Sequence, residues 1–283
     1  MHASAAVARG RASAFICAAR QREHSAIETA VAESPLRFLF PRPTFAAGAR
    51  PAWVCLTTLG GGFVKGDAID IDVEVKPEAT LLMTTQASTK IFRGASRQSI
   101  RAKVAGTLVV LMDPVACFKD AIYTQRADIE LADGGSVIWV ESVTSGRPAF
   151  ETPFSFEKYS SKIRIERNGD PLVVDAVALD RTHGSIAARF ERAGRTAFDT
   201  LTTIVAIGSA AKLLAGDLLA PAELTRDGLG DIAVAPTTLD AAHGSGALVR
   251  IAATSSENAA GETRRRLRNL PEILMVDPFA FRW

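Results

Sequence analysis

The sequence is poor in the residues that build metal centres and covalent cross-links. Only three cysteines and four histidines occur among the 283 residues. Cys17, Cys55 and Cys117 lie far apart and form no C-x-x-C pair. This spacing argues against a disulfide framework and suits a reducing compartment. No two histidines are spaced i, i+4, so we do not expect a histidine-based zinc site.

Strong net charge and long apolar runs are missing as well. The formal net charge is +2, and no dense Lys/Arg stripe is interleaved with aromatics, so a nucleic-acid partner is not expected. We interpret the run Arg264–Arg266 as the solvated face of a helix rather than a phosphate site. No stretch approaches the roughly 18 uninterrupted apolar residues of a membrane span. We therefore expect a cytoplasmic protein without a membrane partner.

The first twenty residues are rich in Arg, Ser and Ala and contain no acid. This composition faintly resembles an organelle transit peptide, and it also fits a poorly ordered tail before a first strand near residues 14–18. We favour the tail and assign it to residues 1–12. No internal repeat, linker or composition shift follows, and 47% of residues are hydrophobic. We therefore expect one domain spanning residues 1–283 with a sizeable core.

Strand patterns dominate the middle of the chain. Residues 69–75 read I-D-I-D-V-E-V, and this period of two predicts a strand with one apolar and one acidic face. The same reasoning predicts strands at residues 81–85, 99–104, 107–112, 127–131, 136–143, 162–166, 172–174, 232–234 and 247–252. The Asn168-Gly169 pair predicts a two-residue hairpin turn.

Helical spacing occurs only late in the chain. Residues 209–219 place Leu and Ala at helical intervals and stop before Pro221, and residues 256–270 open with Ser-Glu and stop before Pro271. Many short strands with frequent turns predict layered, antiparallel-rich β-sheets. The fold class is therefore mainly β with two α-helices near the C-terminus.

Signatures of catalysis are lacking. The glycines at 60–62 are not followed by the G-K-[ST] of a phosphate-binding loop or by a helix pattern. A hydrolase could be imagined around His243 or His183, but no G-x-S-x-G elbow is present. We expect a protein that is not an enzyme.

Three carboxylates adjoin apolar strand patterns. Glu141 and Asp175 directly follow such runs, and Asp67 directly precedes one. Carboxylates at strand ends are most often solvated or bonded to backbone N–H groups and Arg side chains. The functional alternative is a polar cavity whose oxygen ligands hold a divalent ion loosely. Spacing alone does not choose between the two.

Four ordered blocks carry a resemblance to a known family. Residues 59–67 read L-G-G-G-F-V-K-G-D, residues 84–93 read T-T-Q-A-S-T-K-I-F-R, residues 112–125 include M-D-P-V-A-C-F-K-D and Y-T-Q, and residues 141–147 read E-S-V-T-S-G-R. Together they resemble the signature segments of the urease accessory protein family UreD, also called UreH. The resemblance covers roughly residues 35–180.

The resemblance implies a fold, partners and a cargo. UreD-like proteins are described as stacked β-sheets in a helical arrangement with two helices. They bind UreF, through it the GTPase UreG, and apo-urease. The family has no tightly bound cofactor and is thought to conduct transient Ni²⁺ through a tunnel toward the nascent urease site. Matching the blocks places Asp67, Glu141 and Asp175 at nickel-handling positions and Thr89, beside Lys90, among the residues that line the tunnel.

The remaining block residues have a physical interpretation of their own. Gly61, Gly62 and Gly66 suit positive φ or close backbone approach in a sharp turn before a strand. Gln86 and Lys90 are polar in an otherwise apolar run, so they either organise a polar network or fix strand register by hydrogen bonds. A β-sheet module that binds a carbohydrate or a protein, unrelated to nickel, remains the alternative function.

Overall fold

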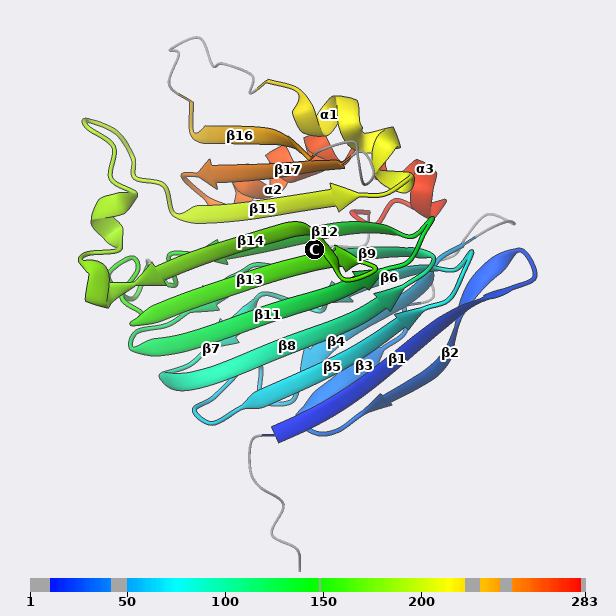
Figure 1. Cartoon of the computed structure of the whole chain (residues 1–283). Helices are drawn as coiled ribbons and strands as arrows, with labels where there is room; N and C mark the ends of the chain where they lie inside the picture. Colours follow the sequence, from blue (N-terminus) through cyan, green and yellow to red (C-terminus); the bar gives the residue numbers. More distant parts are fainter. Residues whose placement is uncertain (1–10, 42–49, 148, 222–229, 240–245, 281–283) are drawn as a thin grey trace, which may run out of the picture.

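The computed structural model describes residues 11–41, 50–147, 149–221, 230–239 and 246–280. It is mainly β, as the sequence predicts: two large sheets face each other, and a few short helices lie at one end (Figure 1). Residues 1–10 of the expected tail lie outside the described residues. The first strand already begins at Arg11, so Arg11 and Ala12 belong to the sheet and not to a tail.

The first sheet, sheet A, has seven strands. In spatial order they are β14 (Asp170–Asp180), β13 (Lys158–Arg167), β11 (Ala121–Leu131), β8 (Gly94–Val104), β5 (Ala68–Val75), β1 (Arg11–Gln21) and β2 (His24–Ala32).

The second sheet, sheet B, has ten strands, two of which lie off its main path. The main path runs β16 (Ile232–Leu239), β17 (Gly246–Ala253), β15 (Thr200–Ile207), β12 (Ser136–Thr144), β9 (Thr107–Leu111), β6 (Thr80–Thr85), β4 (Ala52–Thr58) and β3 (Leu36–Leu39). The short strands β7 (Thr89–Ile91) and β10 (Val115–Cys117) pair with each other at the side.

The middle of the chain winds as a coil between the two sheets. Strands β5, β8 and β11 lie in sheet A, while β6, β9 and β12, which follow them in sequence, lie in sheet B. Each of these strands therefore pairs in parallel with the strand one coil earlier, as β8 does with β5 and β9 with β6. This confirms a helical arrangement of stacked sheets. The expectation of antiparallel-rich sheets is wrong for this region, because the short turns cross between sheets and do not close hairpins.

Antiparallel pairing is confined to the two ends of each sheet. One of these pairs, β13 with β14, forms the hairpin that the Asn-Gly signal predicts. Asn168 and Gly169 both have positive φ, at 52° and 86°, as a tight hairpin turn requires.

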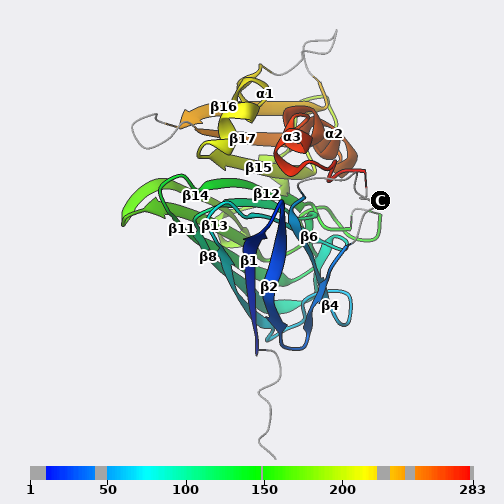
Figure 2. The same cartoon turned by 90° about the vertical axis from the view of Figure 1, so that its right-hand side faces the viewer.

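The two sheets differ in how they are buried. Sheet A contributes one face to the large core between the sheets, and its other face is exposed, so β5 alternates in burial along its length. Sheet B is covered on both faces, because a second core packs helices and the C-terminal segment onto its outer side. Figure 2 shows the helices over that outer side, next to β15, β16 and β17. Strand β12 is accordingly buried along almost its whole length.

The helical regions are shorter than the sequence pattern predicts. Residues 209–219 form a 3-10 turn, Ala210–Leu214, followed by α1, Ala215–Leu219. Helix α2 spans Ser256–Arg266, is capped by the Ser255 side chain, and is followed by α3, Leu270–Leu274. Pro271 therefore lies in the first turn of a helix, where its missing N–H costs nothing, and does not end one.

Arg266 fixes α2 to the rest of this helical cover. Its side chain is fully buried, with Nε 2.6 Å from Glu262. Its Nη1 donates to the carbonyl of Leu218, at the end of α1. The expectation that the Arg264–Arg266 run lies on a solvated face is therefore wrong for Arg266, whose side chain points into the helical cover.

Two expectations based on composition can be compared with the structure. All three cysteines are buried and free, in line with the absence of a disulfide framework. Among the described residues, no helix has the length and apolar character needed to cross a membrane.

Candidate functional site

A cavity of about 260 Å³ opens between the sheets at the end where the glycine-rich turn lies. Its wall comes from the ends of β4 and β6, from β7, and from the inner faces of β8 and β11. Predicted residues that line it are Gly61, Gly62, Gln86, Thr89 and Lys90. Gln86, Thr89 and Lys90, predicted as a polar network, and Gly61 and Gly62, predicted as turn residues, thus lie around one cavity, and Lys90 and Gln86 are exposed.

Gly62 allows the turn to approach the neighbouring short strand. A Cβ at Gly62 would lie 2.3 Å from the carbonyl oxygen of Lys90, so any larger residue would push β7 outward. Gly66 needs its freedom for a different reason, since its φ is +94° with open space around it. Asp67 then closes the same turn, with its carboxylate accepting a hydrogen bond of 2.8 Å from the Val64 N–H. Asp67 lines neither this cavity nor the chamber behind it.

A smaller chamber of about 30 Å³ continues inward from the large cavity. The two share the same wall over five residues, Gln98, Met112, Asp113, Val115 and Gln125. The chamber is large enough for one or two water molecules, each of which needs about 10–15 Å³. Glu141, Trp139 and Ser161 line its inner end. Residues that line the large cavity beside the glycine-rich turn therefore also line the chamber to which Glu141 belongs.

Glu141 is a buried carboxylate held only by neutral hydrogen-bond donors. Its side chain accepts from Ser161 Oγ at 2.6 Å, from Gln125 Nε2 at 2.9 Å and from Trp139 Nε1 at 3.1 Å. Burial raises the pKa of Glu141 above its usual value, and these hydrogen bonds only partly oppose the shift. No Lys or Arg forms an ion pair with Glu141 among the contacts of the described residues. The ionised form of Glu141 would therefore have no counter-charge among these contacts.

Glu141 belongs to two facing polar rows, which we call the polar belt. On sheet A, strand register aligns Gln98, Gln125 and Ser161 across β8, β11 and β13. On sheet B, register aligns Glu141, Thr203 and Arg250 across β12, β15 and β17. The hydrogen bonds of Glu141 connect the two rows. The belt thus crosses a core that is otherwise aliphatic and aromatic.

Asp175 extends the polar belt, and its carboxylate already forms an ion pair with Arg250. Its carboxylate lies 2.5 Å from Arg250 Nη2 and joins edge strand β14 of sheet A to β17 of sheet B. Its negative charge also contributes to the raised pKa of Glu141. The structure therefore brings Glu141 and Asp175 into one electrostatic neighbourhood, while Asp67 is held in the glycine-rich turn.

Asp113 is one of several residues at this site that sequence reasoning missed, together with Gln98, Ser161, Thr203 and Arg250 of the polar belt. Its carboxylate accepts from Thr85 Oγ1 at 2.8 Å, and Thr85 Oγ1 in turn accepts from the Asp113 N–H at 2.7 Å. Asp113 lines both inter-sheet spaces and also a pocket of about 150 Å³ under α2. Asp113 belongs to the third block that resembles the family, residues 112–125, and this was the only signal in the sequence. The block alone does not show that Asp113 lines all three pockets.

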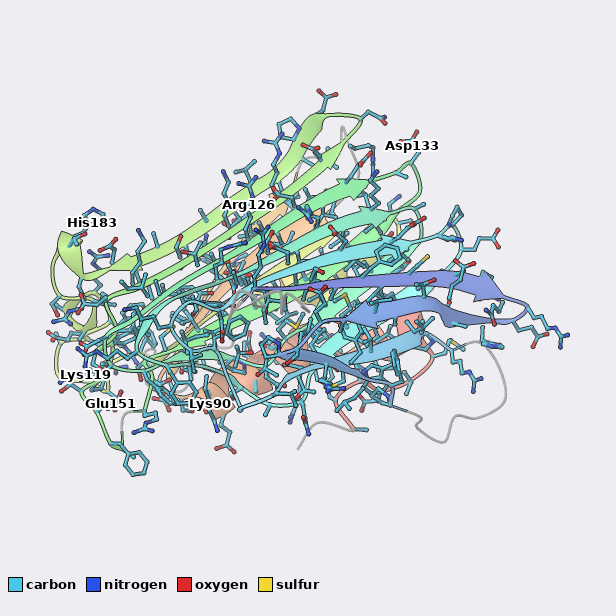
Figure 3. The ribbon with its side chains drawn as sticks, turned by 90° about the horizontal axis from the view of Figure 1, so that it is seen from below. Lys90, Lys119, Arg126, Asp133, Glu151 and His183 are labelled. Atoms are coloured by element: carbon cyan, nitrogen blue, oxygen red, sulfur yellow. The ribbon has the colours of Figure 1, made fainter. Side chains whose placement is uncertain are left out.

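No preformed metal centre accompanies these groups. Within the described ranges, no three His, Cys, Asp or Glu side chains gather as a metal-ligand cluster. Asp67, Glu141 and Asp175 therefore do not form one site, and their assignment to nickel remains a prediction. His183 is exposed in a short 3-10 turn at the surface (Figure 3), and His243 lies outside the described residues.

Comparison with known proteins identifies the family. The sequence profile described as UreD urease accessory protein matches residues 10–275. A urease accessory protein UreD of Sorangium cellulosum is 40% identical over 261 residues, which cover 91% of this chain and 80% of that protein. The corresponding protein of Anaeromyxobacter is 36% identical over 267 residues, covering 90% of this chain and 84% of its own.

The similarity extends to plants. A urease accessory protein D of Arabidopsis thaliana is 28% identical over 275 residues, with 87% of this chain and 92% of that protein covered. The matched region contains both sheets, the polar belt and the helical cover. The chain therefore belongs to the UreD family of urease accessory proteins.

Proposed function

We propose that this protein acts in urease maturation as a scaffold that binds UreF, and through it the GTPase UreG, together with apo-urease. In this proposal Ni²⁺ is a cargo that passes between the sheets toward the nascent urease site. The work takes place in the cytoplasm, a reducing compartment that suits the three free cysteines. The protein itself is not an enzyme and holds no tightly bound cofactor.

The observation that carries the proposal is a buried carboxyl group without a cationic partner, in a chamber that shares lining residues with the large cavity. The large cavity and the chamber share part of their walls, and Glu141 lies where the chamber ends. A buried carboxylate without a cationic partner is costly, because low dielectric penalises its charge. A divalent cation that reaches the chamber would supply the missing charge.

The residues that line these two spaces are suited to weak rather than tight binding. Gln86, Thr89, Gln98 and Gln125 offer neutral oxygen atoms, and Glu141 offers the charge. Tight Ni²⁺ sites use His or Cys ligands, and a conduit must release its ion. Entry of Ni²⁺ favours the ionised form of Glu141 over the protonated form.

Asp175 has a more limited role in this proposal. Its carboxylate must leave Arg250 before it can contact a metal ion, since the two lie 2.5 Å apart. We therefore assign Asp175 to the electrostatic environment of Glu141 first, and to nickel contact only when the ion pair opens. Asp67 acts by shaping the glycine-rich turn beside the cavity mouth.

The decisive experiment replaces Glu141 by Gln during co-expression with UreF, UreG and apo-urease. Gln fits the same contacts: its amide oxygen accepts from Trp139 and Gln125, and its NH₂ donates to the Ser161 hydroxyl, which reverses that one bond. The variant thus removes charge while it keeps the network. We expect a large loss of urease activity and urease-bound nickel, with assembly of the complex unchanged.

A matched control replaces a carboxylate that faces solvent. Asp72→Asn on β5 removes the same charge from the outer face of sheet A, where Asp72 pairs with Arg101. This variant should activate urease like the wild type. Normal urease activation by the Glu141→Gln protein at limiting nickel would rule out the conduit.

A further inference from the structure

The pairing of strands in sheet B is interrupted beside Glu141. Strand β12 pairs with β9 up to Val140 and pairs with β10 again from Val143 onward. Between these points, residues 112–114 of the β9–β10 connection stand opposite only Glu141 and Ser142, which is one extra residue, as in a β-bulge. On the other side of this connection, β6 and β7 are separate strands too. We call this interruption the sheet B gap.

The backbone at the sheet B gap is ordered by groups outside β12. The Asp113 N–H donates to the Thr85 hydroxyl at 2.7 Å. Pro114 has no N–H, and its carbonyl accepts from the Thr89 N–H at 3.0 Å. Neither hydrogen bond leads to β12. The connection is therefore fixed in place while the gap beside β12 persists.

Residues at the sheet B gap line spaces on both faces of the sheet. The Glu141 side chain points between the sheets, where it accepts from donors of sheet A. Ser142 points to the outer face, where its hydroxyl lies 2.7 Å from that of Thr202. Met112, Asp113 and Ser142 line both the chamber that contains Glu141 and the pocket of about 150 Å³ under α2. The chamber and this pocket are therefore neighbours across the gap.

The pocket under α2 reaches the protein surface. Ser256, Ala260 and Arg264 line it from α2, and all three are exposed. Among its described lining residues, Asp113 supplies the negative charge and Arg264 the positive charge. The Arg264 guanidinium lies 6.0 Å from the centroid of the Phe279 ring, which also lines the pocket. Because the two charges offset each other, the pocket is suited to passage of a dication rather than to its retention.

We propose that the pocket under α2 is the second opening of the nickel conduit, and that the ion crosses sheet B through the gap lined by Met112, Asp113 and Ser142. The inference rests on the proposed function, because a conduit needs two ends and the large cavity supplies one. Asp113 lines the large cavity, the chamber and the pocket under α2. Its carboxylate and the Ser142 hydroxyl offer oxygen ligands to a divalent ion along the crossing.

The test closes each opening with a phenyl ring. Ala260→Phe fills the pocket under α2 and Ala87→Phe fills the large cavity, and both alanines are exposed lining residues. Gly261→Phe is the matched control, because Gly261 is exposed on α2, lies outside the pocket lining and has open space around it. During co-expression with UreF, UreG and apo-urease at limiting nickel, both alanine variants should lower urease-bound nickel several-fold. The control should transfer nickel like the wild type, and assembly of the complex should be unchanged in all three.

A second measurement follows a dication into the purified full chain without any partner. Ser161→Cys places a thiol in the chamber, and Hg²⁺ capture by this thiol is followed by the absorbance of the mercury–thiolate bond. The same protein without Ser161→Cys gives the background of the native cysteines. Once Ala87→Phe has closed the large cavity, adding Ala260→Phe should slow capture several-fold, whereas adding Gly261→Phe should not.

Three results would overturn the second opening. They are wild-type nickel transfer by the Ala260→Phe protein, an equal loss with Gly261→Phe, and Hg²⁺ capture that Ala260→Phe does not slow. The capture rate decides the question if Ala260→Phe also weakens assembly. Failure of the proposed function is distinguishable, because it appears as normal activation by Glu141→Gln. A loss with Glu141→Gln and normal transfer with Ala260→Phe would keep the conduit and remove only its second opening.

Discussion

Two regions of the molecule each bury a glutamate, and they do so in opposite ways. Glu262, under the helical cover, is 8% exposed and lies between Arg265 and Arg266. Glu141, between the sheets, is 6% exposed and has only neutral donors. Burial alone would raise the pKa of both carboxyls, but the two arginines lower that of Glu262, whereas burial prevails at Glu141.

The charge of Glu262 is paired within the fold, whereas Glu141 has no cationic partner and could pair with an incoming cation. The charge of Glu262 is compensated by Arg265 and Arg266, and Nη1 of Arg266 also donates to the Leu218 carbonyl at the end of α1. Glu141 has hydrogen bonds but no counter-charge, so it gains most from an arriving cation. This contrast leads to four predictions, given below from the largest expected effect to the smallest.

Removing the acid from the complete pair should have the largest effect. Glu262→Ala leaves the fully buried guanidinium of Arg266 without its carboxylate. Breaking a buried ion pair from one side typically costs about 3–5 kcal/mol. We expect the free energy of unfolding, measured by urea denaturation, to fall by about that amount. A loss below about 1 kcal/mol would mean that Arg266 finds a second acceptor and that the pair is not structural.

Replacing the lone acid by an apolar residue should come next. Glu141→Leu removes the acceptor of Trp139 Nε1 and Ser161 Oγ, whereas Gln125 Nε2 keeps its contacts with Tyr159 and Ser161. Each buried unsatisfied donor costs about 1–3 kcal/mol, although removal of a desolvated charge offsets part of this. We expect a net loss of about 2–3 kcal/mol in the same urea experiment. Wild-type stability would show that the network contributes little to the fold.

The effect of the isosteric replacement Glu141→Gln on stability should depend on pH. The raised pKa of Glu141 means that the folded protein binds its proton more tightly than the unfolded chain does. Protonated Glu141 therefore contributes to the stability of the wild-type protein. This contribution is fully present below pH 4.5, the ordinary glutamate pKa, and is lost as pH rises through the raised pKa. Glu141→Gln should be more stable than the wild type near neutral pH, with the difference vanishing in acid. A pH-independent difference in melting temperature would contradict the raised pKa.

The smallest effect is expected at the outer face of sheet A. Asp72 and Arg101 form an ion pair of 2.7 Å with about half of each side chain exposed. Exposed pairs contribute about 0–1 kcal/mol, so Asp72→Asn should change the free energy of unfolding by no more than that. Any change should shrink in 1 M salt. A larger, salt-independent loss would show that the Asp72–Arg101 pair stabilises the sheet.

The sequence predicts strand β5 well, because only one of its faces is buried, but it misses β2 and predicts only part of β11 and β14. Residues 69–75 alternate strictly, and β5 alternates in burial in the same way. Strand β15 has no such pattern, because sheet B is covered on both sides and Thr202, Thr203 and Ile204 are all buried. Periodicity therefore could not identify it. The parallel pairing also could not be predicted, since it depends on which sheet each turn leads to.

The candidate site was predictable only in part, for a related reason. Glu141 could be found because a charge follows an apolar run, and the block resemblance marked the residues of the cavity mouth. The partners of Glu141 lie 16 and 20 residues away on other strands, and Arg250 lies 75 residues from Asp175. Contacts at such separations follow from register between strands, which no local pattern encodes. The absence of a cationic partner beside Glu141 therefore became apparent only from the folded structure.

The winding of the chain between two sheets has a consequence for synthesis. Each coil covers the free strand edges of the coil before it, as β8 does for β5 and β9 for β6. A chain interrupted at any point would end in an uncovered pair of edges, which are templates for pairing with other chains. The protein leaves the ribosome as a succession of such unfinished edges. In the complete fold only β14 and β2 remain as the edges of sheet A, and β16 and β3 as the ends of the main path of sheet B.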